Sequence, residues 1–109
     1  MAFDESLAAR IRKAIGRKKG IEEKKMFGGL GFLLNGNMCV GVWKNSMIVR
    51  LGTEESESAL LEPHVGEFDI TGKAMKGWIM VAAEGVAGEI DVKQWVQRAV
   101  RFVGKLPVK

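Results

Sequence analysis

The chain of 109 residues contains one cysteine, one histidine, two prolines and no tyrosine. A single cysteine excludes an internal disulfide and is typical of a reducing compartment. Cys39 and His64 supply two ligands, whereas a structural zinc site needs about four, so they predict no metal site. The sequence also has no internal repeat, low-complexity tract or linker, which predicts a single domain over residues 1–109.

Signals for secretion and membrane insertion are missing as well. Asp4 and Glu5 follow the initial Met1, where a signal peptide needs a basic region. The uncharged stretch from Met26 to Trp43 is long enough to raise the question of a membrane span. Five glycines and two asparagines within it fit a spanning helix poorly. We therefore expect a cytoplasmic protein that does not contact the membrane.

What the chain does contain is ordinary for a globular domain. It is 47% hydrophobic and 28% charged, close to the averages of about 45–50% and about 25%. Its formal net charge is +4, which permits binding to nucleic acid without requiring it. Composition therefore excludes a disordered or fibrous chain and leaves the function open.

The stretch from residue 25 to residue 51 predicts three consecutive antiparallel strands. Asn35-Gly36 between two apolar runs is a strong hairpin signal, because both residues tolerate the positive φ angles of a type I′ turn. Lys44-Asn45 is a weaker signal for the second turn. In the last of these strands one face is the more apolar, because three residues alternate with Ile48 and Arg50: Met47, Val49 and Leu51.

The first turn also predicts the register of its hairpin. A two-residue turn at Asn35-Gly36 places Leu33 opposite Met38 and Phe32 opposite Cys39. A slip by one residue would exchange the two faces of the strand.

Helices are predicted over residues 5–18, 54–61 and 92–103, where apolar residues recur at helical spacing or acidic residues open a short segment. Asp4 and Asp91 are placed to cap the first and last helix, and Ile90 to pack on Trp95. Gly20 is the expected terminator of the first helix. Residues 77–83 predict a central strand, residues 21–24 a connector and residues 68–70 a short extended piece.

The predicted order is helix, three strands, helix, one or two strands, helix. Strands that follow one another directly, with helices between the groups, are typical of the α+β class and not of a parallel sheet. We expect two layers, with the helices packed on one face of an antiparallel sheet.

The glycine cluster Gly28-Gly29-Leu30-Gly31 resembles a phosphate-binding loop in composition only. Such a loop must lead directly into a helix N-terminus, whereas Phe32 and the leucines after it continue a strand. We interpret the cluster as a strand with a bulge or with another backbone close by.

Catalytic arrangements are equally weak. Cys39 lies in an apolar strand, which favours a buried and inert thiol, and His64 follows Pro63 in a loop. A nucleophile and base would need mutual contact and an orienting group. The paired carboxylates, such as Glu54-Glu55, fit helix capping and solvation. We expect no enzyme, no cofactor and no small-molecule substrate.

Basic residues are the stronger candidate for a site. On a helix, Arg10, Lys13 and Arg17 would share one side, and the last helix adds Arg98 and Arg101. If the two terminal helices lie side by side, these five cations form one surface for DNA or another polyanion. The alternative is a solvated helix face without a ligand, which is the usual role of such charge runs. The aromatic residues occupy core-like positions, so no base-stacking platform is predicted.

Trp43 stands at a predicted turn and is the tryptophan least certain to be buried. If it is exposed beside Met38 or Met47, it would mark a surface for a protein partner.

Several segments resemble the N-terminal domain of the TfoX/Sxy family of bacterial competence regulators. The resemblance covers nearly the whole chain and rests on a set of short matches: Met26-Phe27-Gly28-Gly29-Leu30-Gly31-Phe32, the Asn35-Gly36 turn, Ile48-Val49-Arg50-Leu51, Phe68-Asp69, Gly72-Lys73, Met75-Lys76-Gly77-Trp78, Trp95-Val96 and Leu106-Pro107. Full-length family members carry a second, helical C-terminal domain, and this chain resembles the stand-alone N-terminal form.

The resemblance implies a fold like that of type III secretion chaperones and a role in transcriptional regulation beside a DNA-bound activator. It also implies a protein partner and a homodimer, because such folds often pair through an uncovered sheet face or edge. We therefore expect a non-enzymatic regulatory module. The alternatives are a peptide- or protein-binding module of the secretion-chaperone type and, as the weakest, a small enzyme.

Overall fold

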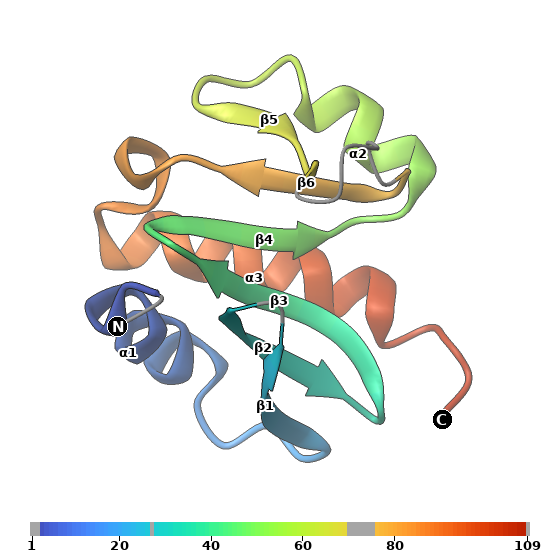
Figure 1. The fold of residues 1–109 in the computed structure, drawn as a ribbon. Helices are drawn as coiled ribbons and strands as arrows, with labels where there is room; N and C mark the ends of the chain where they lie inside the picture. Colours follow the sequence, from blue (N-terminus) through green and yellow to red (C-terminus); the bar gives the residue numbers. More distant parts are fainter. Residues whose placement is uncertain (1–2, 27, 70–75, 109) are drawn as a thin grey trace.

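The computed structural model describes residues 3–26, 28–69 and 76–108 (Figure 1). The predicted α+β class is confirmed, with more strands than the four or five expected. The elements follow one another in this order: α1 (Glu5–Ile15), β1 (Ile21–Met26), β2 (Gly29–Leu34), β3 (Asn37–Trp43), β4 (Ser46–Arg50), α2 (Thr53–Ala59), β5 (Val65–Glu67), β6 (Trp78–Val81), the 3-10 helix η1 (Ala83–Val86) and α3 (Glu89–Val103).

The strands form one antiparallel sheet in the order β1-β2-β3-β4-β6-β5. Strands β1 and β5 are therefore the two edges. Strand β6 pairs with a neighbour on both sides, which confirms the predicted central position. It is shorter than the predicted residues 77–83, because Ala83 opens η1. Burial alternates along β6: Ile79 and Val81 are buried, whereas Trp78 and Met80 are half-buried.

All three α-helices contribute to one hydrophobic core on one face of the sheet. Figure 1 shows α3 running behind β3 and β4. This confirms the predicted two layers, with the helices on one face. Its buried members come from every helix and from four strands or their ends: Leu7, Ala8, Ile11, Ala59, Val86, Val92, Trp95, Val96, Ala99, Val103, Leu30, Phe32, Leu34, Cys39, Val40, Val42, Met47, Val49, Leu51, Ile79 and Val81.

Both predicted two-residue turns are present. Asn35 and Gly36 adopt φ angles of 53° and 84° between the paired residues Leu34 and Asn37. Lys44 adopts φ 55°, and Trp43 pairs with Ser46 across the second turn. At Asn35-Gly36 both φ angles are positive, as a type I′ turn requires.

The predicted connector at residues 21–24 is wrong, because these residues open the edge strand β1. They include Glu22, Glu23 and Lys24, so the segment shows no apolar alternation that would predict a strand. An edge strand exposed on both sides does not need that alternation.

The glycine cluster is part of a crowded strand, as predicted. A Cβ atom added to Gly29 would collide with the carbonyl oxygen of Val42 in β3. Gly31 pairs directly with Gly41, and a Cβ on Gly41 would lie 2.9 Å from the Leu30 carbonyl oxygen. Neighbouring backbones therefore approach here more closely than side chains would permit.

The register prediction was half right. Leu33 does pair with Met38, but Phe32 pairs with Val40 and not with Cys39, because the register shifts between Phe32 and Leu33. Cys39 is the extra residue of this irregularity. A bulge of one residue carries no clear sequence signal in a continuous apolar run.

Each of the three α-helices differs from its prediction at one end or at both. Asp4 caps α1 as predicted, since its Oδ1 accepts from the Ser6 and Leu7 amides at 2.9 and 3.2 Å. However, α1 ends at Ile15, where Gly16 takes φ 64°, and not at residue 18 before Gly20.

Helix α3 begins at Glu89 after Gly88, three residues before the predicted start. Asp91 thus lies inside its first turn and not at the cap. Ile90 is 72% exposed, so it does not pack on Trp95.

The segment between β4 and β6 also begins earlier than predicted. Helix α2 starts at Thr53 and ends at Ala59, and the short edge strand is Val65–Glu67. The extended piece predicted over residues 68–70 is not seen at Phe68, which is buried against Trp78 with ring centroids 5.9 Å apart. Its last residue, Ile70, lies outside the described residues.

Candidate interaction surfaces

Helices α1 and α3 contact one another, which was the condition for a common basic face. Lys13 Nζ lies 3.0 Å from Glu89 Oε1 at the start of α3. The Arg10 guanidinium is half-buried and donates to Ser6 Oγ at 2.8 Å and to the Val86 carbonyl at 3.1 Å. Both cations are thus engaged within the protein. Together with Lys93 and Glu89 they line a groove of about 220 Å³.

Arg98 is the most engaged of the five predicted cations. Its Nη atoms donate to both carboxylate oxygens of Glu62 at 3.2 and 3.0 Å, and its Nε lies 3.8 Å from Glu55 Oε2. The guanidinium carbon also lies 4.4 Å from the centre of the Trp95 ring. Arg98 therefore fastens α2 to α3 and presents only 26% of its side chain to solvent.

Arg17 and Arg101 are exposed and form no ion pair in the part of the chain that is described. Arg101 lines a groove of about 320 Å³ with Arg98 and Lys105. Arg17 lies beyond Gly16, where α1 has ended, so the helical spacing used to group it with Arg10 does not apply. The structure thus brings the predicted cations together as two pairs, one in each groove, with Arg17 apart from both.

Met47 is not an exposed interface residue. It is 0% exposed and belongs to the core below the helices, which corrects the prediction that paired it with Trp43. The physical reason is the alternation of a strand: Met47 pairs with Val42 and points toward the helices. Trp43 pairs with Ser46 on the other face, is half-buried, and has Lys44 Nζ 4.7 Å from its ring centre.

The face of the sheet opposite the helices carries a second apolar surface. We call it the open face. Its side chains follow from the register of the paired strands, and all except Ile48, which is 3% exposed, are half-buried: Leu33, Met38, Trp43, Ile48, Trp78 and Met80.

Arg50 lies on the open face among these side chains. Its guanidinium carbon is 5.2 Å from the centre of the Trp78 ring and 5.9 Å from that of Phe102. Its Nη1 donates to the Met38 carbonyl at 3.4 Å. Of this surface, the sequence predicted only Trp43 with Met38 or Met47, and Met38 does lie on the same face as Trp43. The contribution of Trp78 and Met80 was not predicted, because residues 77–83 form a nearly continuous apolar run.

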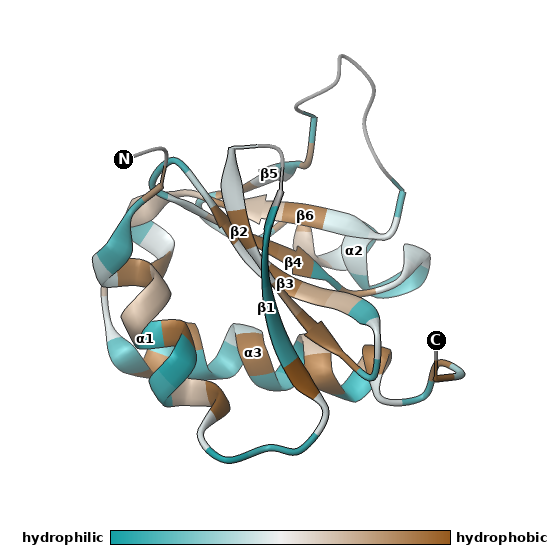
Figure 2. Ribbon diagram, turned by 60° about the horizontal axis from the view of Figure 1, so that its bottom comes forward, coloured by the Kyte–Doolittle hydropathy of each residue, from teal (hydrophilic) through white to brown (hydrophobic). Residues whose placement is uncertain are grey.

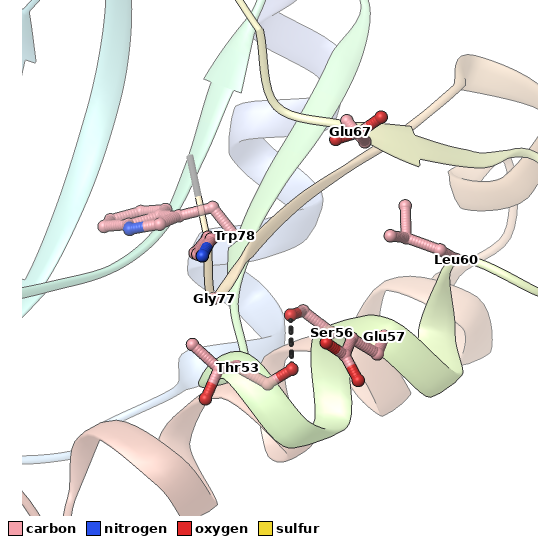
Figure 3. A pocket seen from close by; sticks show the side chains of 8 residues that line it. Thr53, Ser56, Glu57, Leu60, Glu67, Gly77 and Trp78 are labelled. Carbon is pink, nitrogen blue, oxygen red and sulfur yellow. Dashed lines mark hydrogen bonds between the residues drawn. The ribbon is translucent and has the colours of Figure 1, made fainter. Parts of the chain in front are cut away.

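A cleft of about 350 Å³ lies between α2 and the ends of β5 and β6 (Figure 3). Ser56 in its wall donates its hydroxyl hydrogen to the Thr53 carbonyl at 3.0 Å. Glu57 and Glu67 contribute carboxylates, and the Trp78 ring extends away from Ser56 in Figure 3. The described residues that line this cleft include no histidine or cysteine, and the Ser56 hydroxyl donates to a backbone carbonyl and not to either carboxylate.

The cysteine and the histidine lie in different parts of the fold. Cys39 is in β3, whereas His64 directly precedes β5, and β4 and β6 lie between these strands in the sheet. Burial raises the pKa of the Cys39 thiol to about 12, so it stays protonated at neutral pH. His64 is exposed and takes φ 65°. Among the described residues, no group of three or more His, Cys, Asp and Glu side chains could hold a metal ion.

Comparison with known proteins gives one match. The model of the TfoX N-terminal domain family matches residues 13–103, which is most of the chain. No curated protein and no solved structure matches significantly, so the implied likeness to secretion chaperones stays a prediction. None of the helices in the described ranges is long and apolar enough to cross a membrane.

Proposed function

We propose that this chain, which belongs to the TfoX N-terminal domain family, is a non-enzymatic regulatory domain that acts by binding another protein. The observation that supports this proposal most directly is the open face. Its half-buried tryptophans and methionines lie opposite the helix layer, where they do not contribute to the main core. Aromatic and methionine side chains of this kind are enriched at protein interfaces.

The chemistry of the open face indicates the kind of partner. A cationic side chain lies over the ring of each of its tryptophans: Lys44 over Trp43 and Arg50 over Trp78. A partner surface that combines apolar side chains with carboxylates would complement both features. We propose transcriptional regulation in a cytoplasmic setting, as the family's link to competence implies.

The cations of the helix layer also favour protein binding over polyanion binding, because most of them are already engaged within the protein. Lys13 and Arg98 are paired with carboxylates, and Arg10 donates to groups within the protein. These contacts reduce the number of cations that are available to a polyanion. Protein binding through the open face is therefore the function that the geometry favours.

A selection from a phage-displayed peptide library tests this proposal. Enriched peptides should combine acidic and aromatic residues, and their binding to the purified protein should persist in high salt because apolar contacts dominate. The variant Met80→Lys should abolish binding, whereas Lys93→Glu on α3 should leave it unchanged. The proposal would be overturned if the selection enriched no peptide. It would also be overturned if the enriched peptides bound Met80→Lys as tightly as Lys93→Glu.

Direct contact with DNA is the second candidate, and the exposed, unpaired state of Arg17 and Arg101 in the described chain favours it. Affinity for a labelled DNA duplex, measured by fluorescence anisotropy, should then fall steeply as salt rises. The double variant Arg17→Glu with Arg101→Glu should weaken binding further at each salt concentration. An unchanged affinity, or no binding at low salt, would exclude these residues as a DNA site.

A further inference from the structure

The edge strand β1 has an unusual charge order. It runs Ile21-Glu22-Glu23-Lys24-Lys25-Met26, and its four charged residues are all exposed. Its only strand partner in the described chain is β2. Figure 2 shows β1 in the foreground, hydrophilic over most of its length. The opposite edge, β5, is only three residues long, so β1 offers the longer free row of backbone donors and acceptors.

Charged side chains usually protect edge strands from pairing. An edge strand whose charged residues all have the same sign is well protected against pairing with its own copy. Like charges would then face one another in both the parallel and the antiparallel orientation. In β1 the sign reverses at the middle of the strand. A parallel copy in register would still place like charges opposite one another, but an antiparallel copy places glutamates opposite lysines on both sides of a single like-charge contact at the axis. The pattern is therefore complementary to itself in one orientation only.

We propose that β1 pairs antiparallel with β1 of a second copy of this chain, joining the two sheets edge to edge. The two-fold axis of such a pair stands perpendicular to the sheet, so each residue faces one on the same side of the sheet. The helices of both copies then lie on the same face of the joined sheet. The proposal stands apart from the proposed function, which uses the open face.

Two symmetric registers pair five of the six residues of β1, and the charges distinguish them. With Glu23 on the axis, Glu22 faces Lys24 of the second copy, twice by symmetry. The two Glu23 carboxylates that meet are each already bound by Arg12, whose Nε and Nη2 donate at 2.8 Å. With Lys24 on the axis, two lysines meet, and neither forms an ion pair in the described chain. The first register therefore places the only like-charge contact where counter-charges are in position.

A charge-exchange experiment tests the contact between Glu22 and Lys24. The wild-type mass should rise from 12.0 kDa toward twice that value as concentration increases in sedimentation equilibrium, and salt should weaken the association. Either Glu22→Lys or Lys24→Glu creates two like-charge contacts and should raise the dissociation constant roughly tenfold. The double variant, with both changes, should restore association.

Matched controls carry the same charge changes elsewhere. Glu84 in η1 and Lys93 in α3 are both exposed. The variants Glu84→Lys and Lys93→Glu should therefore associate like the wild type. Circular dichroism establishes that each variant is folded. A wild type that stays monomeric, single variants that associate normally, or a double variant that is not restored would each overturn the proposal. None of these outcomes affects peptide binding at the open face, so the two proposals fail separately.

Discussion

The two faces of the sheet differ most clearly along a single strand. In β6, Ile79 and Val81 are 0% exposed below the helices, whereas their neighbours Trp78 and Met80 are half-buried on the open face. All four residues are large and apolar, so their composition does not separate them. The difference lies in what covers them: helices cover Ile79 and Val81, whereas Trp78 and Met80 keep part of their surface in solvent.

The largest expected effect contrasts two adjacent residues of β6. Ile79→Ala should lower the free energy of unfolding by about 2–5 kcal/mol, because it leaves a cavity in the core. Met80→Ala should cost about 1 kcal/mol or less, since part of the side chain is already in water. Urea unfolding followed by circular dichroism measures both. Equal losses would contradict the division between the two faces.

The glycines of the open face provide the next contrast. Gly29→Ala should cost about 1–3 kcal/mol, because the added methyl group collides with the backbone of Val42. Gly66→Ala in β5 is the matched control, because no atom lies within 4 Å of its added Cβ. It should change stability by no more than about 0.5 kcal/mol. A tolerated Gly29→Ala would show that β2 and β3 can separate without loss.

Within the helix layer, the pair of Arg98 and Glu62 should matter more than its exposed neighbours. Arg98→Ala should cost about 1 kcal/mol, at the upper end for a partly exposed ion pair, because it releases α2 from α3. Arg101→Ala, one turn away without an ion pair in the described chain, should change stability by less than about 0.5 kcal/mol. A double-mutant cycle with Glu62→Ala isolates the coupling, and a coupling of zero would contradict this role.

Turns and helix order could be predicted because they depend on local chemistry. The Asn35-Gly36 turn adopts the positive φ angles that its residues favour, and the Asp4 cap needs only its own helix. The edge strand β1 was missed because an exposed strand of charged residues lacks a periodic pattern. The bulge at Cys39 was missed because both registers bury apolar side chains.

The candidate sites were harder to predict because they depend on packing between distant segments. Arg98 looked like one of several surface cations, but its partners Glu55 and Glu62 lie in or just after another helix. Arg17 was grouped with Arg10 by a helical spacing that Gly16 interrupts. Met47 and Trp43 are close in sequence yet lie on opposite faces. In each case the missing information was the three-dimensional partner of the residue.

The smallest expected effect concerns Arg12 and Glu23, which join the helix layer to the edge strand β1. The hydrogen bonds from Arg12 lower the pKa of Glu23 below its ordinary 4.5, so the pair stabilises the fold above that pH. The contribution is lost as pH falls through the folded-state pKa. Because both side chains are more than one third exposed, it should be only about 0.5 kcal/mol. Unfolding in urea at pH 7 and pH 3 should show Glu23→Gln less stable than the wild type at pH 7 and equal to it at pH 3. A difference that persists at pH 3 would mean that Glu23 acts through packing and not through charge.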